Sequence, residues 1–266
     1  MIKIFLLTLF LSTAIFAEVY YAKVEPYEFY NIASDVTGVV TKTNENLLGK
    51  VLHNEVYIHI DDKLDKDEYS YTKEKLKELQ NTLLIAQTTL ENTQEILKRK
   101  RVNYKKIEAM KIKSRIEKDR EFYDLIGSEN SYLATQKEIN SLKMQIADLM
   151  LRQKTLEKTL HDKKLQAQGL TLYSIEVKEG QFVNKGTLLA KLADTSKALL
   201  TIYVNENDIK KIQKKIIYID GKKTKYKVKR FVTIADSVNI SKYKAQIIIK
   251  APKIFSQLVK VELKEE

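Results

Sequence analysis

A stretch of more than a hundred residues with a single chain-breaking residue limits what this sequence can fold into. Gly127 is the only glycine between Gly49 and Gly169, and both prolines, Pro26 and Pro252, lie outside that stretch. The segment is rich in Lys, Glu, Gln and Leu, which favour the helical conformation. Long helix is therefore predicted for the middle of the chain.

Apolar residues recur in this stretch with the three-four spacing of a coiled coil. One register runs through Tyr69, Leu76, Leu83, Leu90, Leu97 and Tyr104, and its second series through Thr72, Leu79, Ala86, Thr93 and Ile107. Another register runs through Leu125, Tyr132, Ile139, Ile146 and Leu160, and its second series through Leu142, Leu149 and Leu156. Because each apolar seam needs a partner seam, two registers in one chain predict an antiparallel helical hairpin.

Two positions could hold the turn of this hairpin. A turn near Lys111–Lys113 gives two arms of comparable length, roughly 65–70 Å for the shorter arm at 1.5 Å per residue. A turn at Gly127-Ser128 uses the one glycine, but it leaves much of the first helix without a partner. A glycine inside a helix costs about 1 kcal/mol relative to alanine, whereas each leucine left in water costs about 1.5–3 kcal/mol. The first position is therefore favoured.

The segments on either side of the hairpin have the composition of β-strands. Residues 29–61 and 169–263 are rich in Val, Ile, Tyr and Thr, arranged in short alternating runs. Each flank contains a turn glycine, then a valine, a second turn residue, and an apolar alternation that ends at an aspartate, Asp61 or Asp194. The repeated pattern predicts one small β domain that the hairpin interrupts.

Glycine, followed by asparagine, tolerates the positive φ that tight turns between strands require. The predicted turn residues are Gly38, Gly49, Asn54, Gly180 and Gly186. Asn54 occupies in the first flank the place that Gly186 occupies in the second.

The N-terminus has the layout of a secretory leader. A positive charge at Lys3 precedes an apolar run from Ile4 to Phe16, and the small residue Ala17 follows it. The run is shorter than the about 20 residues of a membrane-spanning helix. Residues 1–17 are therefore expected to be a signal peptide cleaved near Ala17, with a retained membrane anchor as the alternative.

Composition argues against several kinds of site. The chain has no cysteine, and His53, His59 and His161 are too few and too scattered for a histidine metal site. No pattern assembles a nucleophile with a base, paired carboxylates or a phosphate-binding loop, so we expect no enzyme, catalytic residue or cofactor. The net charge is +12. Export puts nucleic acid out of reach, so this charge is expected to serve an anionic membrane surface or an acidic partner protein.

Taken together, these features resemble the HlyD-type membrane fusion proteins, the periplasmic adaptors of tripartite efflux and type I secretion systems. Those adaptors carry a lipoyl-like domain cut in two by an α-helical hairpin, followed by a small β-barrel. The segment from Gly180 to Asp194 carries the most specific similarity, and the segment from Leu200 to Ile209 is similar to the entry of the adaptor barrel.

The resemblance implies an α+β fold in which a long antiparallel coiled-coil hairpin is inserted in a split lipoyl-like β domain, followed by a small β-barrel. The expected parts are a signal peptide (1–17), an N-terminal strand segment with the first lipoyl half (18–62), the hairpin (63–164), the second lipoyl half (165–196), and the barrel with a C-terminal tail (197–266). It also implies a periplasmic location, peripheral to the inner membrane, and a homo-oligomer. The implied partners are an inner-membrane transporter of the ABC or RND type and a TolC-like outer-membrane channel.

Members of this family carry at the hairpin tip an arginine, a leucine four residues later and a serine seven residues after that. These positions fall on Asn103, Ile107 and Ser114, and Glu117 completes the pattern of a helix capping box with Ser114. Between Lys98 and Lys118 the sequence has ten basic residues and only two acidic ones, which predicts a basic tip that meets an acidic rim on the channel. The predicted partner-binding residues are Asn103, Ile107, Lys111, Lys113, Ser114 and Arg115.

Two alternative interpretations share some of these features. A periplasmic holdase chaperone with coiled-coil tentacles is also exported, basic and helical, but such chaperones lack the two glycine-turn halves and the long C-terminal β segment. Residues 108–112 resemble a biotin-attachment sequence around Lys111. In carrier domains that lysine lies on a tight β-turn, whereas here it lies at the end of helical heptads. The adaptor is the preferred interpretation.

Overall fold

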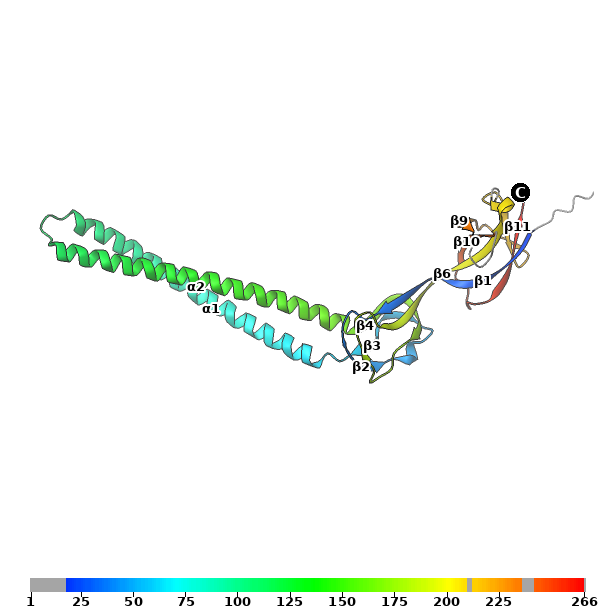
Figure 1. Cartoon of the computed structure of the whole chain (residues 1–266), viewed down its shortest axis with the longest axis horizontal. Helices are drawn as coiled ribbons and strands as arrows, with labels where there is room; N and C mark the ends of the chain where they lie inside the picture. Colours follow the sequence, from blue (N-terminus) through cyan, green and yellow to red (C-terminus); the bar gives the residue numbers. More distant parts are fainter. Residues whose placement is uncertain (1–17, 210–211, 236–241, 266) are drawn as a thin grey trace, which may run out of the picture. The chain divides into compact units, whose positions relative to one another are not determined.

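The computed structural model describes residues 18–209, 212–235 and 242–265, so the predicted signal peptide lies outside the described residues. The chain forms two compact units. The hairpin unit contains Asp35–Thr41 and His59–Leu165, and the β unit contains Lys42–Ile58 together with the chain up to Ser34 and from Gln166 onward. Figure 1 shows the two long helices of the hairpin, and the strands that precede and follow them in sequence. The fold class is α+β, as the sequence predicts.

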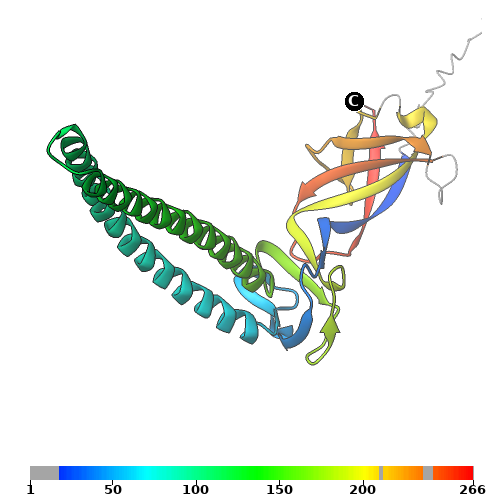
Figure 2. The same ribbon diagram turned by 60° about the vertical axis from the view of Figure 1, so that its left-hand side comes forward.

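Two helices, α1 (Lys63–Ala109) and α2 (Arg115–Asp162), make up most of the hairpin unit. Their antiparallel course is visible in Figure 2, and residues 110–114 form the turn between them. The favoured turn position is therefore confirmed, and the alternative is wrong because Gly127 lies inside α2. Neither helix is long and apolar enough to cross a membrane.

The side chains buried between the two helices lie at the predicted heptad positions, except Thr135, which was not named and lies one heptad before Leu142. The buried residues are Thr72, Leu76, Ala86 and Leu97 of α1, and Thr135, Ile139, Leu142, Ile146 and Leu156 of α2. Ala86, Ile139 and Leu142 form one buried cluster, against which Leu79, Leu83 and Leu90 pack. The coiled-coil registers are thus confirmed.

The β unit is organised around two long strands that pair along most of their lengths. Strand β1 (Glu18–Ala33) is antiparallel to β6 (Leu188–Asn205), in a register that runs from Ala33↔Leu188 to Val24↔Leu200. The register shifts after Pro26, which has no N–H to donate to the ladder. On the N-terminal side of this shift, the first residues of β1 also pair with β11 (Leu258–Lys264).

The other strands lie on either side of this pair. The first group follows the order β5-β2-β3-β4-β6, with β2 (Gly38–Thr43), the short 3-10 helix η1 (Glu45–Leu47), β3 (Val51–Ile60), β4 (Lys164–Ile175) and β5 (Phe182–Val183). The second group follows the order β1-β11-β7-β8, and β10 pairs with both β6 and β9. Its remaining elements are α3 (Glu206–Ile209), β7 (Ile216–Ile219), β8 (Lys222–Lys223), β9 (Val228–Ala235) and β10 (Lys242–Lys250).

Alternate residues of β6 form the centre of the core of this second group. Ala198, Leu200, Ile202 and Val204 are buried at a spacing of two, as in a strand with one solvated face. They belong to one cluster with buried side chains of β1, β10 and β11. The core of this second group therefore draws on β1 as well as on the predicted barrel segment 197–266, whose first residues lie inside β6.

Four of the five predicted turn residues have a positive φ: Gly49 (74°), Asn54 (72°), Gly180 (83°) and Gly186 (86°). Gly38 differs, because it begins strand β2 and its φ lies outside the left-handed region. A Cβ atom at Gly38 would lie 2.7 Å from Cγ2 of Ile60. The prediction of a turn at Gly38 is therefore wrong, and this glycine is required by the close approach of β2 and β3.

Substituting Gly186 tests the requirement for positive φ in isolation. No atom lies within 4 Å of a Cβ built at this position, so the cost of a side chain is backbone strain alone. We expect Gly186→Val to lower the unfolding free energy of the β unit by about 1–3 kcal/mol, and Gly186→Asn to cost less because asparagine tolerates positive φ. Denaturant melts followed by circular dichroism measure both. Equal losses for the two variants would contradict this account of the turn.

Candidate functional site at the hairpin tip

The turn between the two helices is built by local hydrogen bonds. Helix α1 ends at Ala109, and the backbone N–H of Met110 donates to the carbonyl oxygen of Ile107 at 3.1 Å. Ser114 is the N-cap of α2: its Oγ accepts from the backbone N–H of Glu117 at 3.3 Å, and its own N–H donates to Oε2 of Glu117 at 2.9 Å. The predicted capping box is present.

Two lysines fix the turn from either side. Nζ of Lys113 lies 2.9 Å from Oε1 of Glu117, and Nζ of Lys118 donates to the carbonyl oxygen of Glu108 at 2.9 Å. The second contact satisfies one of the last carbonyls of α1, which have no partner inside the helix. The bonds from Lys113 and then from Ser114 lower the pKa of Glu117 to about 2.

This low pKa gives the turn a defined dependence on pH. Because the folded pKa of Glu117 lies below its ordinary value of 4.5, the stabilising bonds of its carboxylate are fully present above that value and are lost as the pH falls toward about 2. We expect an NMR titration of the Glu117 carboxyl to show a midpoint near the lower value, and Ser114→Ala to raise that midpoint. An unchanged midpoint in the variant would contradict the role of the capping box.

The outer surface of the turn is apolar and basic. Ile112 is 93% exposed and Ile116 is 81% exposed. The side chains of Lys111 and Arg115 are also exposed, the latter at 95%. We call Lys111, Ile112, Arg115 and Ile116 the tip surface. Sequence reasoning missed both isoleucines, although their position outside the seam registers, next to the turn, was a signal that could have found them.

The predicted partner-binding residues occupy different places in this structure. Lys111, Lys113, Ser114 and Arg115 lie together in the turn and the first residue of α2, whereas Asn103 and Ile107 lie further back along α1. Ile107 is half-buried at its seam position, and Asn103 donates through Nδ2 to Oε2 of Glu121 at 3.4 Å. The structure therefore places Ile107 between the helices, and the outward-facing isoleucines are the two at the turn.

Antiparallel pairing also changes the charge of this end of the hairpin. Apart from Glu117, the acidic residues of α2 follow Lys118 in sequence and return alongside α1, where Asp124 pairs with Lys100 and Glu129 pairs with Arg101. The count of ten basic and two acidic residues therefore overstates the charge. Within the described part of the chain, the basic residues of the segment that make no contact with a carboxylate are Lys98, Lys105, Lys106, Lys111 and Lys118.

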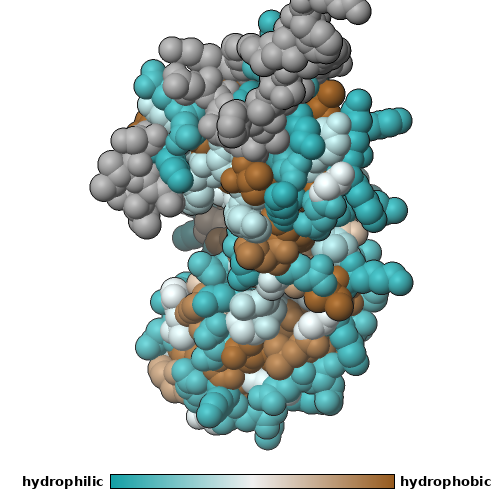
Figure 3. Space-filling view, turned by 90° about the vertical axis from the view of Figure 1, so that its right-hand side faces the viewer, coloured by the Kyte–Doolittle hydropathy of each residue, from teal (hydrophilic) through white to brown (hydrophobic). Residues whose placement is uncertain are grey.

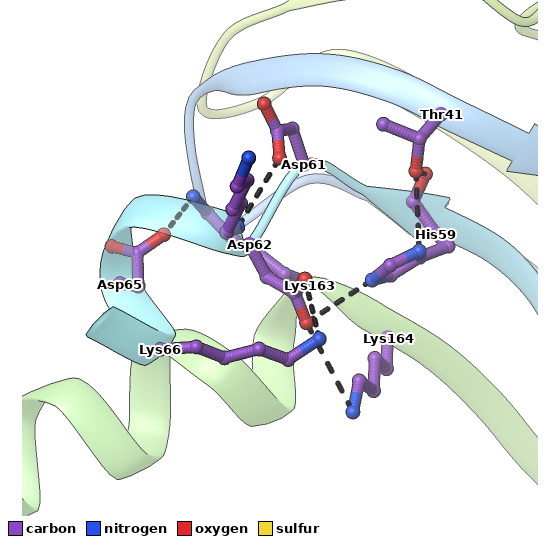
Figure 4. Close-up of polar contacts among 9 residues, drawn as sticks. Thr41, His59, Asp61, Asp62, Asp65, Lys66, Lys163 and Lys164 are labelled. Atoms are coloured by element: carbon purple, nitrogen blue, oxygen red, sulfur yellow. Dashed lines mark hydrogen bonds and ion pairs between the residues drawn. The ribbon is translucent and has the colours of Figure 1, made fainter. Parts of the chain in front are cut away.

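The opposite end of the hairpin unit is held by a buried carboxylate (Figure 4). Asp62 precedes α1 and is 3% exposed. Its oxygens lie 3.1 Å from Nε2 of His59, 2.8 Å from Nζ of Lys66 and 3.9 Å from Nζ of Lys164. Burial opposes ionisation, but the contacts with Lys66 and His59 outweigh it and hold the pKa of Asp62 below its usual range.

Other contacts join the same strand and helix ends. Lys163 pairs with Asp65, and its carbonyl oxygen accepts from the N–H of Ile60 at 2.8 Å. Oγ1 of Thr41 lies 3.1 Å from Nδ1 of His59. The start of α1 and the end of α2 are therefore tied to each other and to the end of β3, so this cluster has a structural role. Among the residues with described positions, no three His, Asp or Glu side chains form a group that could hold a metal ion.

Comparison with solved structures identifies proteins of the same fold. MacA from Actinobacillus actinomycetemcomitans matches with a TM-score of 0.69 and 20% identity, over 93% of this chain and 78% of that chain. A membrane fusion protein from Streptococcus pneumoniae matches with a TM-score of 0.65 and 9% identity, over 94% of this chain and 99% of that chain. A chimera of MacA that carries the α-hairpin domain of Pseudomonas aeruginosa MexA matches with a TM-score of 0.52 and 19% identity, over 94% of this chain and 82% of that chain. No protein-family model and no curated protein matches the sequence.

Proposed function

Because the chain has the fold of membrane fusion proteins, we propose that it is a periplasmic adaptor that links an inner-membrane transporter to an outer-membrane exit channel. The proposal includes export directed by residues 1–17, a location peripheral to the inner membrane, and assembly into a homo-oligomer. The expected partners are a transporter of the ABC or RND type and a TolC-like channel.

The observation that carries this proposal is the tip surface. Two isoleucines that are 93% and 81% exposed make almost no contribution to the stability of the hairpin. Burying each of them against a partner would contribute about 1.5–3 kcal/mol to binding. Helix α1, which has 47 residues, holds them about 70 Å from the start of the hairpin. A long spacer with apolar groups at its end fits docking onto a distant partner.

The charges of the tip surface complement this apolar contact. Lys111 makes no ion pair with a described residue, and Arg115 lies 3.9 Å from Asp119 while its side chain remains 95% exposed. We propose that both face an acidic rim on the mouth of the channel. Such charges mainly accelerate association, and their effect weakens with salt because the Debye length falls from about 10 Å at 0.1 M to about 3 Å at 1 M.

Crosslinking in intact cells tests the proposal. The full chain is then purified, and the proteins crosslinked to it are identified. We expect one outer-membrane channel and one inner-membrane transporter to co-purify, and export of the transported compound to stop when the chain is deleted. Recovery of many unrelated soluble proteins, with no channel among them, would indicate a holdase chaperone and would contradict the adaptor function.

A further inference from the structure

The segment that joins β8 to β9, together with the first residues of β9, presents lysines on its exposed side. Tyr226 packs against the core and Val228 is buried in it, whereas Lys225, Lys227 and Lys229 are exposed. The chain is held in this orientation because Oγ1 of Thr224 donates to the carbonyl oxygen of Ile217 at 2.8 Å, and the hydroxyl of Tyr226 accepts from the N–H of Lys250 at 3.2 Å.

Two neighbouring features extend this basic surface. Lys222 and Lys223 form the exposed edge strand β8, and among the described strands they pair with β7 alone. In β9 a register shift separates the pairs Val228↔Ile247 and Arg230↔Gln246, so Lys229 is an extra residue in the strand. Both Lys229 and Arg230 are therefore exposed. We call Lys222, Lys223, Lys225, Lys227 and Lys229 the lysine strip.

No carboxylate of the described residues neutralises the lysine strip. Between Asp220 and Asp236 the sequence contains six basic residues and no acidic one. None of the five lysines pairs with a carboxylate within the described part of the chain. In contrast, Lys260 and Lys264 on β11 both pair with Glu262. Like charges that repel one another add nothing to the stability of the fold, which points to an external anion.

Apolar side chains continue the same strand beyond the lysines. Val232 is 45% exposed and Ile234 is 76% exposed. Figure 3 shows a face of the β unit on which hydrophilic side chains predominate, with hydrophobic ones between them. Lysines next to exposed apolar side chains are the combination that binds the interface of an anionic bilayer, where charge attracts and apolar groups insert.

We propose that the lysine strip binds the surface of an anionic phospholipid bilayer. The choice of residue supports a lipid surface over an acidic protein. Recognition of individual carboxylates favours the planar, bidentate guanidinium of arginine, whereas the strip consists of lysines, which act as point charges. The one arginine, Arg230, donates through Nη2 to the hydroxyl of Tyr27 at 3.0 Å. This proposal is independent of docking at the hairpin tip.

Vesicle flotation with the full chain tests the proposal, using phosphatidylcholine vesicles with and without phosphatidylglycerol. The readout is the ratio of binding to the two vesicles. It is compared between variants that share residues 1–17, so any contribution of that segment to the ratio cancels. One lysine near an anionic surface contributes about five-fold to binding. We therefore expect the triple variant Lys225→Gln, Lys227→Gln, Lys229→Gln to lower the ratio about a hundred-fold, and 1 M salt to abolish the preference.

The matched control is Lys73→Gln, Lys75→Gln, Lys77→Gln on α1, which removes the same charge from exposed helix positions and should leave the ratio unchanged. An equal fall in both triple variants would overturn the proposal, because net charge alone would then explain binding. A ratio that stays high in the strip variant, accompanied by self-association of the chain, would also overturn it. The lysines would then serve only to keep the edge strands from pairing with other copies.

Discussion

Replacing Ile112 and Ile116 together with aspartate is expected to abolish capture of the outer-membrane channel while the hairpin keeps its stability. Both side chains are almost fully exposed, so changes there should alter the unfolding free energy by no more than about 0.5 kcal/mol. Binding loses the burial of two apolar side chains, about 1.5–3 kcal/mol each. The tip surface also gains two carboxylates, which the proposed acidic rim would repel. Co-purification of the channel from crosslinked cells measures the loss.

The control for this variant is Ile85→Asp. Ile85 is likewise exposed, at 68%, but it lies in the middle of α1, far from the turn. We expect this variant to capture the channel normally. If Ile85→Asp and the double variant lost the channel equally, the contact would not be at the tip surface. Charge reversal of Lys111 and Arg115 should add a milder, salt-dependent loss, whereas reversal of Lys113 would also disturb its bond with Glu117.

Truncating the buried leucines of the seam is expected to destabilise the hairpin most. Leu97 and Leu156 are 4% and 3% exposed, so Leu97→Ala and Leu156→Ala should each lower the unfolding free energy by about 2–5 kcal/mol. The half-buried Leu83 and Leu149 should cost less when truncated, because part of each side chain is already in water. Denaturant melts of the full chain, followed by helical circular dichroism, measure these differences.

Leu84→Ala provides the matched control on α1. It removes the same atoms as the seam variants, but Leu84 is 65% exposed and lies one residue away from a seam position. We expect a change of about 0.5 kcal/mol or less. Similar effects from Leu84→Ala, Leu97→Ala and Leu156→Ala would show that the hairpin is not held by its seam.

The hairpin could be predicted from sequence because its signals are local and periodic. Leucines at three-four spacing define the seam without reference to the rest of the chain, and the spacing of Ser114 and Glu117 defines the start of the second helix. The strands were less predictable. Alternation in β6 shows which side chains are buried, but it does not show that β1 pairs with β11 across more than two hundred residues of sequence.

The candidate site was only partly predictable for a related reason. Heptad analysis sorts residues into seam and surface, so Ile112 and Ile116, which belong to neither register at the turn, received no role. The charge count over residues 98–118 stopped before Asp124 and Glu129 of α2, which are distant in sequence from Lys100 and Arg101 but adjacent to them in space. The cluster around Asp62 forms because the end of a strand lies next to the ends of two helices, and no sequence pattern predicts that contact.

Site-specific crosslinking in intact cells tests the adaptor account most directly. The chain has no cysteine, so a single introduced cysteine is the only thiol available. We expect a cysteine at position 112 to crosslink to an outer-membrane channel, and a cysteine at position 127, inside α2, to form no such product. A channel crosslink at 127 with none at 112 would contradict docking through the hairpin tip.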